Sequence, residues 1–345
     1  MLILRSHFDT FFQIIVSIRV ILIATLRSIG SVPKTVVTLP KLPTWSFFFH
    51  TVIQVIRAYI QVHAKDIAVL RSVTDFPIIP TIPRSVYYWT ETIRGVECEI
   101  IVPRFNPISK DLDVVLKSPQ SPVCLYLHGG GFALCNPATH RPVTHGISEK
   151  SNAIVVVPHY RRIPDHSLQD ALDDCRAVFD SLSLMRKICV CGDSAGGALA
   201  VMLTNEVRKR ISCMALISPW CDFRDQLDDL HEEEGLYDFI APQALRDMGN
   251  LVETCNLNSQ LKSPMEIVEN QHELDAIPIM IQVGGCETLI RQIFKFSKHV
   301  SSATVRVYEY MVHVPHFFSI LHQEAYNAMM DLCEFFKVNH NIKDR

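Results

Sequence analysis

Several features of specialised protein classes are absent from this sequence of 345 residues. It contains no Asn-x-Ser/Thr acceptor, which argues against a heavily glycosylated secreted protein. No Cys-x-x-Cys pair has a histidine partner, as a zinc site would require. With 33 Lys and Arg against 36 Asp and Glu, the net charge of −3 is too balanced to suggest a nucleic-acid or polyanion partner. Neither an internal repeat nor a low-complexity tract interrupts the chain.

Cysteine is more frequent than in most chains, but the number, eleven, is odd. Several cysteines, such as Cys124, Cys189 and Cys213, lie in or beside apolar runs, where cysteine is usually a small core hydrophobe. Hydrophobic residues make up 48% of the chain, enough for one large domain with an N-terminal extension.

The string Gly-Asp-Ser-Ala-Gly-Gly at residues 192–197 matches the Gly-x-Ser-x-Gly nucleophile elbow. It follows an apolar, strand-like run at 188–191 and precedes helix-forming residues at 198–207. The turn of such an elbow is so tight that only small residues fit around the serine. A helix N-terminus directly after Ser194 would also stabilise negative charge near it. Ser194 is therefore the candidate nucleophile.

A second glycine-rich string, His-Gly-Gly-Gly-Phe at residues 128–132, follows the apolar run 123–127. Glycines let a loop approach a substrate closely, so we expect the backbone N–H groups of Gly130, Gly131 and Ala195 to form an oxyanion hole. The alternative is a glycine-rich turn without chemistry. We expect His128 to support this loop rather than to act as a base.

Together the two strings resemble the hormone-sensitive-lipase-like branch of the α/β-hydrolases, a group of carboxylesterases, lipases and deacetylases. Residues 157–166 and 217–220 are also similar to family segments, and the resemblance runs from about residue 122 to 333. It implies a Ser–acid–His triad in that chain order, no metal and no organic cofactor.

The resemblance places the acid after the apolar run 279–283, two residues before a leucine. Glu287 occupies that position, with Thr288 where the family commonly has proline. Glutamate can orient an imidazole as aspartate does, so Glu287 is the candidate acid. The alternative is a solvated loop carboxylate.

Two histidines follow the alternating run 305–310. The family's closing strand commonly leads into Gly-Met-x-His-x-Phe, and Met-Val-His-Val at 311–314 reproduces this pattern with His313 in place. His316 matches only the aromatic residues that follow it. We therefore favour His313 as the base and keep His316 as the alternative.

Apolar runs at 123–127, 154–157, 188–191, 214–217, 279–283 and 305–310 alternate with helical stretches such as 167–182. This alternation predicts an α/β fold with a doubly wound, mainly parallel sheet. With the resemblance, we expect the α/β-hydrolase fold and an N-terminal helical cap or anchor. The expected organisation is a hydrophobic segment at 1–30, a cap and linker region at 31–110, and the hydrolase domain at 111–345. The acid-rich run 225–234 is expected to be a solvated connection near a lid.

Residues 11–26 are strongly apolar and resemble a membrane anchor, although Arg19 within them disfavours insertion. An interfacial helix, a cap element and a targeting segment are the alternatives, and no small-x-small cleavage site follows. A second run, 45–62, has apolar residues at helical spacing and is expected to be a cap helix. The expected location is a membrane, with the endoplasmic reticulum as a candidate, or otherwise the cytoplasm.

These observations predict a serine hydrolase that cleaves carboxylic esters of hydrophobic alcohols, with short acyl groups. The arrangement resembles fungal steryl acetyl hydrolases, which makes an acetylated sterol or a secondary-metabolite ester a candidate substrate. The partners expected are a small hydrophobic ester and a membrane through the N-terminal segment, but no nucleic acid. The alternative is a non-catalytic protein that binds a hydrophobic ligand, like the plant gibberellin receptors, which resemble this family but lack the catalytic histidine.

Overall fold

The computed structural model describes residues 42–75, 85–104, 110–116, 121–183, 186–223, 235–256, 261–270, 274 and 277–340. Two predicted features, the hydrophobic segment at 1–30 and the acid-rich run at 225–234, therefore lie outside the described residues.

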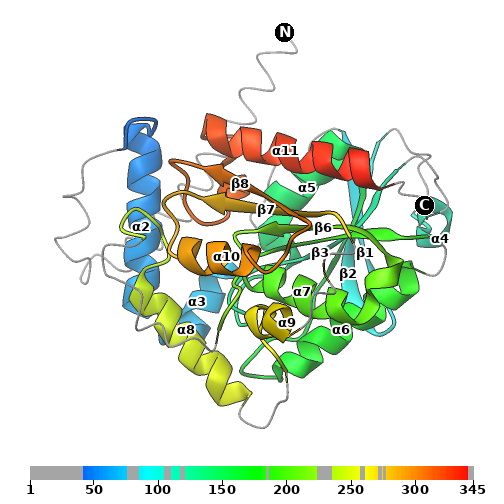
Figure 1. Ribbon diagram of the computed structural model, residues 1–345, viewed down its shortest axis with the longest axis horizontal. Coiled ribbons are helices and arrows are strands. Elements are labelled where there is room, and N and C mark those ends of the chain that lie inside the picture. The colour runs from blue at the N-terminus through cyan, green and yellow to red at the C-terminus, as the bar shows by residue number, and fades with distance from the viewer. Residues whose placement is uncertain are drawn as a thin grey trace.

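An eight-stranded sheet forms the centre of the molecule, with the strand order β1-β2-β4-β3-β5-β6-β7-β8 (Figure 1). Strand β2 is antiparallel to both β1 and β4, and the remaining neighbours are parallel. The strands are β1 (Val86–Ile93), β2 (Val96–Pro103), β3 (Val123–Leu127), β4 (Ile154–Pro158), β5 (Ile188–Asp193), β6 (Ile211–Ile217), β7 (Ile279–Gly284) and β8 (Ala303–Tyr308). The six predicted apolar runs are strands β3 to β8, which confirms a doubly wound, mainly parallel sheet.

Strands β1 and β2 lie within residues 31–110, for which the sequence predicts a cap and linker region. The structure places them instead at one end of the eight-stranded sheet. Most residues of β1 are only half-buried or exposed, because β1 is the outermost strand. Its sequence therefore lacks the continuous apolar run by which the buried strands were recognised.

Helices cover both faces of the sheet (Figure 1). On one face, α5 (Arg141–Ser151) and α11 (Gln323–Asn339) pack against the strands. The other face is covered by α6 (Leu168–Leu182), α7 (Ala195–Val207), α9 (Pro264–Asn270) and α10 (Ile290–Ser297). Strands buried on both faces have to be largely apolar, as β3 and β4 are throughout and β5 is up to Cys191. All eleven cysteines are free and most are buried, as expected of core hydrophobes.

The remaining helices are α2 (Phe47–His63), α3 (Ile67–Thr74), α4 (Leu112–Leu116) and α8 (Pro242–Cys255). Short 3-10 turns occur at Pro137–His140, Arg208–Arg210 and Pro315–Phe318. No helix in the described ranges is both long and apolar enough to span a membrane.

Helix α2 is the second apolar run of the sequence and forms as predicted. The Ser46 hydroxyl caps it by accepting the Phe49 N–H at 3.0 Å. Its buried side packs Phe49 into a cluster with Met311 and Val312, in the segment after β8. The indole N–H of Trp45 also donates to the Tyr310 carbonyl at 2.6 Å. The N-terminal helix is thus fastened to the loop that carries His313.

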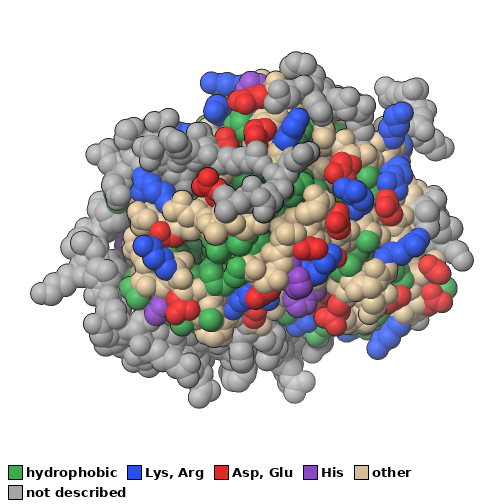
Figure 2. Space-filling model, turned by 90° about the horizontal axis from the view of Figure 1, so that it is seen from below, with side chains coloured by type: hydrophobic (Ala, Val, Ile, Leu, Met, Phe, Trp, Pro, Cys, Tyr) green, Lys and Arg blue, Asp and Glu red, His purple; other side chains and the backbone are tan. Residues whose placement is uncertain are grey.

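Helices α8 and α9 lie at the bottom of Figure 1, and Figure 2 views the molecule from that side. Hydrophobic side chains gather near the middle of this face. Basic and acidic side chains are interspersed around them.

Candidate active site

Ser194 lies in the turn between β5 and α7, with a φ of 52° and only 8% of its surface exposed. A positive φ is strained for a residue other than glycine, which is typical of a nucleophile elbow. The neighbouring positions 192 and 196 have no room for a side chain. A Cβ on Gly192 would lie 2.2 Å from the Gly196 carbonyl oxygen, and one on Gly196 would lie 2.0 Å from the Leu127 oxygen. The structure thus gives the predicted strand–turn–helix context of Ser194.

The glycine-rich loop after β3 lies directly on this elbow. A Cβ on Gly129 would be 3.0 Å from the Cβ of Ser194. Gly130 and Gly131 adopt φ values of 110° and 62°, and their amide N–H groups have no hydrogen-bond partner among the described residues. Ala195 is the first residue of α7, where helical N–H groups lack an intrahelical acceptor. The three predicted oxyanion donors are therefore on the loop and the elbow that meet at Ser194.

Asp193 fastens the loop to the elbow. Its carboxylate accepts hydrogen bonds from the Tyr126 hydroxyl at 2.7 Å and the Gly129 N–H at 3.1 Å. His140 Nε2 lies 3.3 Å from the other carboxylate oxygen. Burial by itself would raise the pKa of Asp193, but His140 and Tyr126 hold it below the usual value. His128 is stacked on Tyr160, whose hydroxyl donates to the His128 carbonyl at 2.6 Å, so it supports the loop as expected.

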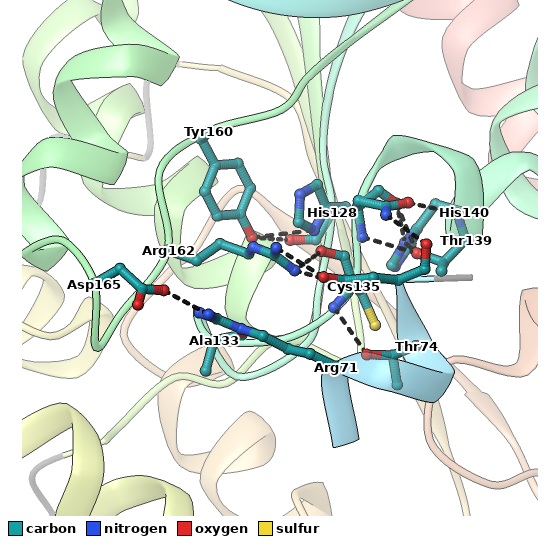
Figure 3. Close-up of polar contacts among 12 residues, drawn as sticks. Arg71, Thr74, His128, Ala133, Cys135, Thr139, His140, Tyr160, Arg162 and Asp165 are labelled. Carbon is teal, nitrogen blue, oxygen red and sulfur yellow. Dashed lines mark hydrogen bonds and ion pairs between the residues drawn. The ribbon is translucent and has the colours of Figure 1, made fainter. Parts of the chain in front are cut away.

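Helix α3 holds the far side of the same loop. In Figure 3 the Arg71 side chain extends from α3, and its guanidinium is directed at Asp165. Arg71 donates to the carbonyls of Ala133 and Ile163, each at 2.7 Å, and to the Asp165 carboxylate at 2.5 Å.

A second arginine, Arg162, continues this connection. It donates to both carboxylate oxygens of Asp75, at 2.6 and 2.9 Å, and to the Cys135 carbonyl at 2.6 Å. Cys135, which follows the oxyanion loop, also donates its N–H to the Thr74 hydroxyl at 3.4 Å. The oxyanion loop is thus held between the elbow and the end of α3.

Glu287 follows β7 and is completely buried. Its Oε2 accepts hydrogen bonds from the Ser218 hydroxyl at 2.6 Å and the Gly284 N–H at 2.7 Å. Its Oε1 has no hydrogen-bond partner in the described part of the chain and lies 3.7 Å from Nδ1 of His313. A solvated loop carboxylate, the alternative considered from the sequence, does not fit this environment.

Of the two candidate histidines, His313 is the one that lies against Glu287. Burial by itself lowers the pKa of His313, but Glu287 and Asp238 raise it above the usual value overall. Its Nε2 is buried and makes no hydrogen bond within the described ranges. His316 lies in the turn Pro315–Phe318, completely buried, and this burial lowers its pKa to about 4. The geometry therefore favours His313 over His316 as Glu287's partner.

Two further residues of the site were missed in the sequence. Ser218 bridges the acid and the base loop, because its hydroxyl donates to Glu287 and accepts the Val314 N–H at 3.0 Å. Its only signal was its place in the family-like segment 217–220. Asp238 accepts the backbone N–H of His313 at 3.0 Å. It had no signal, because it follows the acid-rich run and resembles another surface carboxylate.

This arrangement has the parts needed for acyl transfer: a serine on a strained turn, a histidine beside a buried carboxylate, and backbone donors that no other described residue bonds. Ser194, Glu287 and His313 follow β5, β7 and β8, whose carboxyl ends lie at one edge of the parallel sheet. Within the described residues no group of His, Cys, Asp and Glu is arranged to hold a metal ion.

Solved structures share the fold. An esterase from the bacterial hormone-sensitive lipase family superposes with a TM-score of 0.64 at 21% identity, covering 92% of this chain and 98% of that one. A hyperthermophilic esterase from the archaeon Pyrobaculum calidifontis gives a TM-score of 0.64 at 19% identity, covering 85% and 98% of the two chains.

Curated proteins are similar in sequence. The carboxylesterase/phospholipase LipF of Mycobacterium tuberculosis is 27% identical over 229 residues, which are 62% of this chain and 61% of LipF. An acetyl-hydrolase of Streptomyces hygroscopicus is 28% identical over 173 residues, 48% of this chain and 57% of that protein. The similarity thus spans about three-fifths of the length of these relatives.

A family model described as the alpha/beta hydrolase fold matches residues 124–319, more than half of the chain. The matched range includes both glycine-rich strings, Glu287 and His313. On the strength of this match and of the strand order around the elbow, the chain belongs to the α/β-hydrolase fold family.

Proposed function

We propose that the protein is a carboxylic ester hydrolase that acts through Ser194, Glu287 and His313. The observation that carries this proposal is the strained Ser194 elbow beside a loop in which the Gly130 and Gly131 N–H groups have no hydrogen-bond partner in the part of the chain that the structure describes. Relatives named carboxylesterase and acetyl-hydrolase support the same class of reaction.

In the proposed mechanism, His313 takes the hydroxyl proton of Ser194 as Oγ attacks the ester carbonyl. Glu287 holds the imidazole in position and stabilises its protonated form. The amides of Gly130, Gly131 and Ala195 bind the tetrahedral oxyanion, and each such donor contributes about 3–4 kcal/mol. His313 then protonates the leaving alcohol. Water, activated by the same histidine, attacks the acyl-enzyme and releases the acid and free Ser194.

The substrate is proposed to be an ester of a hydrophobic alcohol with a short acyl group. Apolar side chains flank the reacting groups. A Cβ on Gly131 would meet the Met248 side chain of α8 at 2.7 Å, and the Phe239 ring lies 5.8 Å from that of His313. An acetylated sterol or secondary metabolite fits these surroundings. The apolar N-terminal segment supports presentation of such a substrate at a membrane.

The test is hydrolysis of para-nitrophenyl acetate, butyrate and decanoate by the purified protein, with Ser194→Ala as the control. We expect turnover that falls with acyl length and decreases at least ~1,000-fold in the Ser194→Ala variant. Similar rates in the folded variant would refute the role of Ser194. A folded wild-type protein without turnover on any ester would favour the receptor-like alternative.

A further inference from the structure

A single buried carboxylate, that of Asp238, joins the two loops that carry the acid and the base. Asp238 is completely buried, between the acid-rich run and α8. Its Oδ2 accepts the N–H of Thr288 at 2.9 Å, next to Glu287. Its Oδ1 accepts the N–H of His313 at 3.0 Å. The side chain therefore bonds to the backbone of the proposed base, His313, and to the backbone of the residue that follows the proposed acid, Glu287.

We propose that Asp238 is a positioning residue of the active site, which holds the backbones of the Glu287 loop and the His313 loop in register so that the two side chains face each other. This inference rests on the proposed function, because it assigns Asp238 to the same catalytic pair. It does not make Asp238 a catalytic residue, since among the described residues its carboxylate accepts hydrogen bonds only from the backbone N–H groups of Phe239, Thr288 and His313.

The residues next to Asp238 in segment 235–240 make further contacts with the same two loops. Gly235 adopts a φ of 63°, and a Cβ there would lie 1.9 Å from the Thr288 hydroxyl oxygen. Thr288 in turn donates that hydroxyl to the Ile240 carbonyl at 2.5 Å. The Phe239 ring meets the His313 ring edge-on. Segment 235–240 thus touches both loops through backbone, hydroxyl and ring contacts.

Arg57 connects the same segment to the N-terminal helix α2. Its guanidinium donates to the Gly235 and Asp238 carbonyls, at 2.6 and 2.5 Å. Asp238 therefore lies between a cap helix and the catalytic loops. Loss of Arg57 would remove the bonds to the Gly235 and Asp238 carbonyls without removing the Asp238 carboxylate.

The charge of Asp238 also acts on His313. Burial raises the pKa of Asp238 to about 6, while the nearby His313 favours its ionised form. The ionisable groups that surround it are Glu287, Cys286, His313 and Arg57. A second carboxylate beside the imidazole stabilises its protonated form, which the mechanism needs after proton transfer from Ser194.

The decisive variant is Asp238→Asn, which keeps the shape but replaces one acceptor oxygen by an NH₂ group. We expect kcat to fall about 10- to 100-fold with KM nearly unchanged, because small displacements of reacting groups cost that much. We also expect the pKa of His313, measured by NMR of histidine-labelled protein and assigned with His313→Gln, to decrease. Asp331→Asn is the matched control, since Asp331 accepts a hydrogen bond from Tyr308 and lies on α11.

Arg57→Ala is the second variant, in case Asp238→Asn does not fold. We expect a decrease of kcat of about 3- to 10-fold, again with little change in KM. Unchanged kcat in the folded Asp238→Asn protein, or in Arg57→Ala when Asp238→Asn is unfolded, would overturn the inference. A wild-type protein without ester turnover, checked beside Ser194→Ala, would instead refute the proposed function. The NMR titration still decides the inference there, because an unchanged His313 pKa in Asp238→Asn contradicts it.

Discussion

His313 and His316 are three residues apart and both buried, yet their surroundings differ in the property that matters for a base. The ring nitrogens of both lack a hydrogen-bond partner among the described residues, but Nδ1 of His313 lies 3.7 Å from the Glu287 carboxylate, whereas His316 has no carboxylate at ion-pair distance in the same part of the chain. A neighbouring carboxylate stabilises an imidazolium ion, and an apolar enclosure destabilises it. The two side chains are therefore expected to respond differently to substitution.

His313→Ala should reduce kcat/KM for para-nitrophenyl acetate by about 1,000-fold or more, because it removes the proposed base. His316→Ala should cost mainly stability, about 1–3 kcal/mol, since it leaves a cavity in the turn before α11. Steady-state kinetics and urea unfolding of both variants measure these effects. A larger catalytic loss in His316→Ala would reverse the assignment of the base.

The pH dependence of kcat/KM follows from the same pair. A base must be neutral to accept a proton, so activity is lost as the pH falls through the pKa of His313. Burial alone lowers this pKa, but Glu287 and Asp238 raise it overall. We therefore expect activity to be lost at a higher pH than the titration of an ordinary histidine would give.

Glu287→Gln should move this acid limb to lower pH, because it removes a negative charge beside His313, and should lower the plateau about 1,000-fold. A pH profile of kcat/KM between pH 5 and 9 measures both changes. A limb that stays in place in the variant would contradict a role for Glu287 as the partner of His313.

At the scale of elements, helix α3 and the oxyanion loop form one unit. Arg71 donates hydrogen bonds to Ala133, Ile163 and Asp165. Asp75, directly after the helix, accepts one from Arg162. Hydrogen bonds from a charged donor contribute about 1.5–3 kcal/mol each when buried, and less where the group is partly exposed, as Arg71 is. The helix therefore stabilises the position of the loop as well as the fold.

Arg71→Ala should lower both the free energy of unfolding, by about 1–3 kcal/mol, and kcat, by about 10-fold, because the oxyanion loop loses its outer support. Chemical unfolding and kinetics at saturating substrate measure the two effects. Arg210→Ala serves as the control, since Arg210 pairs with Asp180 at the end of α6. A loss of kcat in the control as large as that in Arg71→Ala would show a general effect of destabilisation.

At the scale of the whole molecule, the described residues form one sheet with helices on both faces and the N-terminal helices fastened to the catalytic loops (Figure 1). The apolar segment at 1–30 precedes this part of the chain. The predicted membrane association depends on that segment, because the helices of the described part are not long and apolar enough to span a bilayer.

Deletion of residues 1–30 should move the protein from the membrane fraction to the soluble fraction, while ester hydrolysis in detergent changes by less than about twofold. The physical reason is that the twelve apolar residues among residues 11–26 supply the hydrophobic transfer energy. Fractionation followed by immunoblotting measures the partition. An unchanged partition would rule out the segment as the anchor.

The elbow, the oxyanion loop and six strands could be predicted because their causes are local. A turn that brings Gly196 within reach of the Leu127 carbonyl admits no larger residue, so the constraint is visible in the sequence itself. Strands β3 to β7 are buried and largely apolar, and β8 begins an alternating run, and these two patterns identified the six strands. Strand β1 was not predicted, because it lies at the edge of the sheet and most of its residues are half-buried or exposed.

By itself, the sequence determined the fold class, and it predicted the nucleophile and the loop of backbone donors. Only the tertiary structure decided which histidine faces Glu287, and it alone brought Ser218 and Asp238 to the site. Ser218 meets Glu287 across 69 positions of the chain, and Asp238 meets His313 across 75. Contacts between such distant residues produce no local sequence pattern, because the role of a buried serine or aspartate depends on the partners that folding brings to it.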